Sequence, residues 1–128
     1  MVTAITEGIR ISVKTKFRGC YLKQNTPQYV FSYEVFIENR SDEAVQLLRR
    51  HWLIADSLNH QEQVEGSGVI GQTPIIEPRG YHQYESGCHL YSGMGAMKGS
   101  YLMRRIVSGE EFKVTIPTFQ LFAPYHLN

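Results

Sequence analysis

Two groups of residues near the middle of this chain have types and spacings that could do chemistry. The first is a glycine triplet, Gly66, Gly68 and Gly71, which has the spacing of the dinucleotide-binding fingerprint. In that fingerprint a strand delivers the loop to a helix N-terminus, whose amides bind a pyrophosphate. Here Pro74 stands where that helix would run. The sequence therefore favours a tight connection between strands, with a nest of amides that binds an anion as the alternative.

The second group contains imidazole and thiol side chains, which suit zinc or cobalt. Cys88 and His89 are adjacent, His82 precedes them closely, and His51 or His60 could complete a site. Neighbouring residues of an extended strand point to opposite faces, so Cys88 and His89 would not readily share one ion. The sequence has no HExxH or CxxC motif. We therefore expect no metal and no other cofactor.

Neither thiol has the sequence context of a catalytic nucleophile. Cys20 or Cys88 would need a general base and a group that orients it, and no motif in the sequence places them. We therefore expect a protein that is not an enzyme.

Composition excludes several other classes of function. The chain has 128 residues, the length of one domain spanning positions 1–128, and a formal net charge of +1. Basic residues cluster at Lys14, Lys16 and Arg18, but nearly balancing acidic residues favour a solvated face over a nucleic-acid site. No apolar run is long enough to span a membrane. With only two cysteines, we expect a cytoplasmic protein with reduced thiols.

Alternation of apolar and polar residues with period two indicates the elements that position these groups. We expect strands at Ile9–Val13, Tyr29–Ile37, Ala44–Asp56, Gln61–Glu65, Ile75–Ile76, Tyr81–Ser86, Met97–Val107, Phe112–Ile116 and Phe119–Phe122. A helix is the competing interpretation of Ala44–Asp56. The strand number and the regular turn signals predict an all-β, antiparallel β-sandwich, with a barrel as the alternative.

The connections between these strands carry glycine, proline and asparagine. Irregular backbone is expected at Gly66–Pro74 and Gly87–Gly95, an interruption at Arg18–Cys20, and loops at Gln24–Pro27 and Ser57–His60. Pro117 should break strand pairing or mark an edge strand.

Several runs, in this order along the chain, resemble the ApaG (CorD) family: Ile9–Val13, Arg50–Trp52, Val64–Pro74, Tyr84–Gly87 with Leu90, and Gly95–Met103. The resemblance implies an immunoglobulin-like or fibronectin type III-like sandwich. It also implies a link to cobalt tolerance and magnesium efflux. Related domains in larger eukaryotic proteins look like interaction modules, and the family supplies no catalytic residues.

Two functional hypotheses follow. The first is a non-enzymatic module that binds an unidentified protein partner through its glycine- and tyrosine-rich connections; the residues expected to bind are Gly66, Gly68, Gly71, Tyr84, Tyr91 and Lys98. For the tyrosines, core packing is the competing interpretation. The second is a small-ligand protein that binds divalent metal, pyrophosphate or nucleotide through the Gly66–Gly71 loop. Association into a homodimer stays open.

Overall fold

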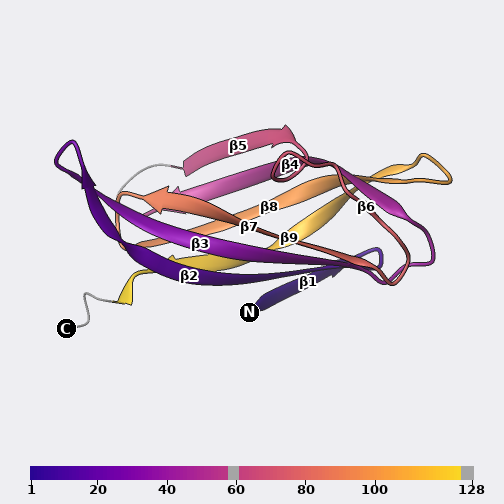
Figure 1. The fold of residues 1–128 in the computed structure, drawn as a ribbon, viewed down its shortest axis with the longest axis horizontal. Helices are drawn as coiled ribbons and strands as arrows, with labels where there is room; N and C mark the ends of the chain where they lie inside the picture. Colours follow the sequence, from indigo (N-terminus) through magenta and orange to yellow (C-terminus); the bar gives the residue numbers. More distant parts are fainter. Residues whose placement is uncertain (58–60, 125–128) are drawn as a thin grey trace.

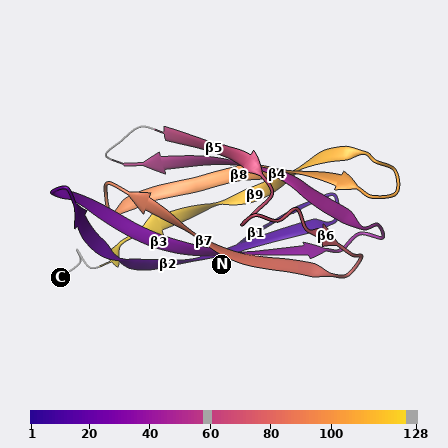
Figure 2. The ribbon, with the colours of Figure 1, turned by 45° about the horizontal axis from the view of Figure 1, so that its top comes forward.

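Two antiparallel sheets face each other in the computed structural model, which describes residues 1–57 and 61–124 (Figures 1 and 2). The first sheet has the order β1 (Val2–Thr6), β2 (Ile9–Lys23), β3 (Thr26–Asn39), β7 (Tyr81–Leu90). The second has the order β5 (Gln61–Ser67), β4 (Val45–Asp56), β8 (Met94–Arg105), β9 (Glu111–Phe122), with β6 (Ile75–Ile76) beside β4. The predicted all-β, immunoglobulin-like sandwich is confirmed. Among the described residues, no helix is long and apolar enough to cross a membrane.

The core lies between the two sheets and is built from alternate residues of each strand. Ile11 of β2 and Val35 of β3 are fully buried, as the period-two pattern predicts. Trp52 is the centre of an aromatic cluster, because its ring lies 5.4 Å from that of Tyr33 and 5.9 Å from that of Phe119. The hydrophobic effect and these edge-on ring contacts hold the sheets together.

Several strand boundaries differ from those predicted. β1 was not expected, and β2 runs through Arg18–Cys20 because a bulge with Gly19 at φ 133° absorbs the irregularity. The loop predicted at Gly87–Gly95 shrinks to residues 91–93, since β7 extends to Leu90 and β8 begins at Met94. The predicted loop Gln24–Pro27 is only a turn, with β3 beginning at Thr26.

Of two other predicted features, the structure describes one. Pro117 lies at a register shift in β9, an outer strand, so it interrupts the pairing as expected. Most of the turn predicted at Ser57–His60 lies outside the described residues.

A second bulge lies in β4 and decides which side chains face the core. The register with β8 shifts between Leu47 and Arg49, so Leu48 is the extra residue. Val45 and Leu47 point inward before the bulge, and Trp52 points inward after it. Arg50 is in phase with Trp52 and therefore shares the inner side of the sheet.

The two long sides of the sandwich are closed differently. On one side β9 packs against β1 and β2, and the Thr115 amide donates a hydrogen bond to Thr6 Oγ1 at 3.2 Å. On the other side the outer strands are β5 and β7, which pair with β4 and β3 respectively. The β5–β7 side is where the cavities described below open.

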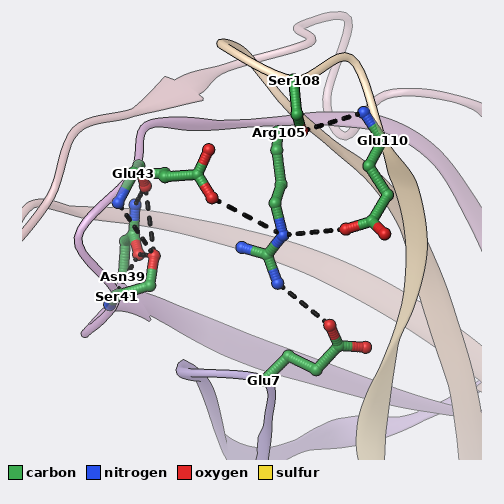
Figure 3. Close-up of polar contacts among 7 residues, drawn as sticks. All are labelled: Glu7, Asn39, Ser41, Glu43, Arg105, Ser108 and Glu110. Carbon is green, nitrogen blue, oxygen red and sulfur yellow. Dashed lines mark hydrogen bonds and ion pairs between the residues drawn. The ribbon is translucent and has the colours of Figure 1, made fainter.

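One end of the sandwich is held by a charged cluster (Figure 3). The Arg105 guanidinium contacts Glu7 at 3.0 Å, Glu110 at 3.3 Å and Glu43 at 3.9 Å, and it lies over the ring of Phe112. These carboxylates come from three different turns, so we assign the cluster a structural role.

Candidate functional site

The glycine triplet ends in a tight turn rather than a phosphate loop. The Val69 amide donates to the Gln72 carbonyl at 2.8 Å, and the Gln72 amide donates back at 3.0 Å. The two central residues, Ile70 and Gly71, have φ of 47° and 71°, as in a type I′ turn. The next element is the short strand β6 and not a helix, so the geometry of the dinucleotide fingerprint is absent.

The three glycines serve different purposes. A Cβ at Gly66 would lie 2.8 Å from Nη2 of Arg50, so this glycine makes room for the guanidinium. Gly68 has φ 63°, and its Cβ would come within 2.1 Å of the Gln72 carbonyl oxygen. A Cβ at Gly71 would meet nothing within 4 Å. Packing against backbone therefore requires glycine at Gly68, and the backbone angle alone favours it at Gly71, whereas a side chain at Gly66 would displace only the end of the Arg50 side chain.

Arg50 is the cation that this loop positions. Its Nη1 donates to the carbonyl oxygens of Ser67 and Gly68, each at 3.0 Å. Its Nε and Nη2 make no hydrogen bond, and the guanidinium pairs with no carboxylate, in residues 1–57 and 61–124. Part of the hydrogen-bonding capacity of a fixed guanidinium is thus unused.

A cavity of about 290 Å³ adjoins this guanidinium, between the sheets on the β5–β7 side; we call it the Arg50 cavity. Its surface is about half polar, with contributions from Arg50, Tyr84 and Ser86, and half apolar, with contributions from Trp52 and Val64. Ile70 and Gly71 of the turn also line it. Within residues 1–57 and 61–124, no carboxylate lines it.

Tyrosine hydroxyls lie deep beside the Arg50 cavity. The hydroxyls of Tyr84 and Tyr101 are hydrogen-bonded to each other, and Tyr101 is fully buried. Burial raises the pKa of both groups, and it raises the pKa of Tyr33 against the opposing effect of a hydrogen bond from Ser86. The Arg50 charge acts in the lowering direction on all three pKa values. The three hydroxyls therefore stay protonated at neutral pH and remain hydrogen-bond donors.

A second cavity, of about 480 Å³, lies farther along the same side. Asp56, Glu62 and Tyr91 are among its lining residues, and the Tyr91 amide donates to Asp56 Oδ2 at 2.6 Å. Ile54 lines both cavities, so they are neighbours. We call the two cavities together the β5–β7 groove.

The residues predicted to bind are only partly brought together. Gly71 and Tyr84 line the Arg50 cavity, Gly66 and Gly68 adjoin the Arg50 side chain without lining the cavity, and Tyr91 lines the neighbouring cavity. Lys98 is exposed on the outer side of β8, because the preceding residue, Met97, points into the core.

Sequence reasoning missed Arg50 and Ser86 as members of the site. Arg50 was interpreted as a charge intruding into an apolar face of the strand. Arg50 stands two residues before Trp52, and residues two apart in a strand face the same side, so the sequence did contain a signal. The bulge at Leu48 obscures it, because Val45 and Leu47 alternate with the opposite parity.

The proposed metal and thiol groups do not converge. Cys88 is buried and His89 exposed, so they occupy opposite faces of β7 as predicted. In the described part of the chain, no three His, Cys, Asp or Glu side chains are placed to hold a metal, and His60 lies outside that part. Burial raises the pKa of Cys88 to about 11, which keeps it a neutral thiol and a poor nucleophile.

Comparison with known proteins gives consistent matches. Residues 20–105 match the family model described as the ApaG domain. Protein ApaG of Brucella suis biovar 1 (strain 1330) is 39% identical over 124 residues, covering 97% of this chain and 95% of the relative. Protein ApaG of Shewanella sediminis (strain HAW-EB3) is 40% identical over 123 residues, covering 96% and 97%.

Two solved structures are also similar. An X-ray structure of the Northeast Structural Genomics Consortium target SoR45 has a TM-score of 0.88 and 38% identity, covering 95% of this chain and 92% of that one. The putative ApaA protein from Bordetella pertussis has a TM-score of 0.80 and 33% identity, covering 91% and 94%.

Proposed function

Because this chain belongs to the ApaG family, we propose that it is a non-enzymatic binding module that holds an extended segment of a protein partner in the β5–β7 groove. The observation that carries this proposal is the groove itself, with cavities of about 290 and 480 Å³ between two outer strands. Extended peptides commonly bind by adding to a sheet edge while their side chains enter pockets.

The composition of β7 supports recognition at its edge. This outer strand has ten residues, Tyr81–Leu90, and contains no lysine, arginine or proline. Natural sheets protect their outer strands with such residues, with bulges or with a covering element. By contrast, β9 carries Pro117 and Lys113 and packs against β1 and β2. The β7 edge is thus the better template for an added strand.

The chemistry of the site supports binding rather than catalysis. Arg50 is a permanent cation, and the tyrosines and Cys88 stay protonated at neutral pH. A general base near neutrality is not among the described residues that line the Arg50 cavity. The two free thiols, at Cys20 and Cys88, suit a reducing cytoplasm.

The family link to cobalt tolerance and magnesium efflux fits a module that acts through its partner. The groove offers no cluster of metal ligands in its described residues, so we place any effect on metal ions in the partner. A nucleotide or pyrophosphate in the Gly66–Gly71 loop is the rival proposal. Calorimetry with cobalt, magnesium, pyrophosphate and ATP tests it directly.

Site-specific photo-cross-linking tests the groove. A photoreactive residue is placed at Gln83 of β7 or Gln63 of β5, and at Lys113 of β9 as the control on the closed side; all three are exposed. We expect cross-links to one partner, in extract of the source organism, from the first two positions only. Equal labelling from Lys113 would contradict the proposal.

Two substitutions then separate the groove from the outer face. Tyr91→Ala should weaken capture of the cross-linked partner with little change in melting temperature. Lys98→Glu should leave capture unchanged, because Lys98 lies on the outer side of β8. The opposite pattern would move the partner surface to that outer face.

A further inference from the structure

We propose that the Arg50 cavity is a binding site for a carboxylate group carried on an apolar body. This cavity is one end of the β5–β7 groove, so the inference rests on the proposed function for its place in the molecule. The carboxylate site itself does not require a protein partner. A free small carboxylic acid and the C-terminal carboxylate of a peptide share this chemistry, and the experiment below distinguishes them.

The backbone of β4 aims Arg50 at the cavity. The bulge at Leu48 places this half-buried side chain on the inner side of β4, where it lines the cavity and its remaining nitrogens are accessible. The Ser67 and Gly68 carbonyls, each 3.0 Å from Nη1, hold one edge of the guanidinium. Nε and Nη2 have no partner in the described chain. A bound carboxylate would satisfy them and would balance the charge.

The tyrosine hydroxyls supply a further hydrogen-bond donor to the cavity. Tyr84 and Tyr101 contribute two protons, and their mutual hydrogen bond uses only one. Tyr101 is fully buried, and Tyr84 is its only hydrogen-bond partner among the described residues, so Tyr101 is best satisfied by donating to Tyr84. The Tyr84 proton then remains available beside Arg50. The cavity therefore has surplus donors and lacks a carboxylate of its own to accept from them.

The charge of the cavity favours one kind of anion. Among the described residues, Arg50 is the only cationic side chain that lines the cavity, which matches one negative charge better than the two or more of a phosphate. Trp52, Ile54 and Met97 form apolar walls for the rest of the ligand. The volume of about 290 Å³ is at the small end of ligand pockets, which suits a group the size of one side chain.

The test is an NMR titration of the full chain labelled with ¹⁵N. The probes are 3-phenylpropanoate and, as the matched neutral compound, 3-phenylpropanamide. Inorganic phosphate is the competing anion. A hexapeptide ending in phenylalanine is used with a free and with an amidated C-terminus, to distinguish a peptide from a free acid.

We expect 3-phenylpropanoate, the free-carboxylate peptide, or both to shift the amide signals of residues 50, 67–71 and 84, and the neutral forms to shift them much less. Arg50→Gln should weaken this binding by about tenfold to a hundredfold, and Tyr84→Phe by about tenfold, because each removes a hydrogen bond to a charged group. Arg49→Gln is the matched control, because Arg49 is exposed and should bind like the wild type.

Tyr84→Phe keeps the test valid if Arg50→Gln loosens the loop. The proposal would be overturned if 3-phenylpropanoate and 3-phenylpropanamide bind equally tightly, or if phosphate binds more tightly than 3-phenylpropanoate. It would also be overturned if none of the probes binds, or if both variants bind with the affinity of the wild type. If the titration overturns the carboxylate site, partner cross-linking that persists in Arg50→Gln would still leave the proposed function intact.

Discussion

Two adjacent arginines in β4 show that the backbone decides which side of a sheet a side chain faces. Arg49 is exposed, whereas Arg50 lines a cavity between the sheets. The two side chains are chemically identical and, as neighbours in a strand, face opposite sides of the sheet. The single extra residue at Leu48 decides which of them faces inward. Bulges are frequent beside binding sites because they re-aim a side chain without changing the fold.

The glycine triplet gives a matched pair of stability predictions. Gly68 and Gly71 both have positive φ, but an added Cβ would clash with the Gln72 carbonyl only at Gly68. Gly71→Ala should cost about 1–2 kcal/mol, the usual penalty of the left-handed conformation. Gly68→Ala should cost clearly more, because the clash is with backbone and the turn must move. Urea denaturation measures both, and equal losses would contradict this structure of the turn.

The neighbouring Ile70 is an unusual residue for its conformation. It has φ 47° and is exposed, although β-branched residues are rarely found there. Ile70→Asn should stabilise the protein by about 1 kcal/mol, because asparagine before glycine is the preferred pair in a type I′ turn. The melting temperature checks this. If stability rises while partner capture falls, Ile70 is retained for contact with the partner.

At the scale of the elements, the Arg105 cluster ties three turns together at one end of the sandwich (Figure 3). The Arg105 side chain is 13% exposed, while its glutamate partners are 39–64% exposed. Arg105→Met keeps a long side chain but removes the guanidinium from the ring of Phe112 and from its three carboxylate partners, which are left facing one another. We expect a loss of about 1–2 kcal/mol, measured by urea denaturation.

Arg10 provides the control for that prediction. It forms an exposed ion pair with Glu38 at 3.7 Å, and Arg10→Met should cost less than about 0.5 kcal/mol. The Arg105→Met penalty should also change with salt, since added ions screen the repulsion among Glu7, Glu43 and Glu110. A penalty no larger than that of Arg10→Met would show that the cluster does not hold this end.

Sequence patterning predicts most strands here but not the points at which their phase changes. The alternation Ile9–Val13 and Tyr29–Ile37 is continuous, so their inner faces follow directly from the residues. Leu48 resembles any other strand residue, and only the pairing with β8 shows that it is extra. The Gly66–Gly71 connection and Tyr84 were predictable members of a site. Arg50 was not, because its role depends on that bulge and on carbonyls 17 and 18 positions away.

At the scale of the whole molecule, the sandwich is asymmetric. β9 closes one long side against β1 and β2, while the cavities collect on the side of β5 and β7. The same inner space holds the buried tyrosines and Cys88. These buried groups must stay neutral in the folded protein.

That requirement predicts alkaline unfolding. Burial raises the pKa of Cys88 from 9.0 to about 11, and it raises the pKa values of Tyr33, Tyr84 and Tyr101 above 10.0. Above pH 9 the unfolded chain loses these protons first, so it binds fewer protons than the native state and the free energy of unfolding falls as pH rises. The stability is fully present below about pH 9 and is lost through pH 11 and above, with a limiting slope of about 1.4 kcal/mol per pH unit for each group. Urea midpoints between pH 8 and 11.5 measure the slope, which should be shallower in Cys88→Ala and Tyr33→Phe. A wild-type midpoint that stays constant to pH 11, or identical slopes in all three proteins, would mean that these groups are not buried as described.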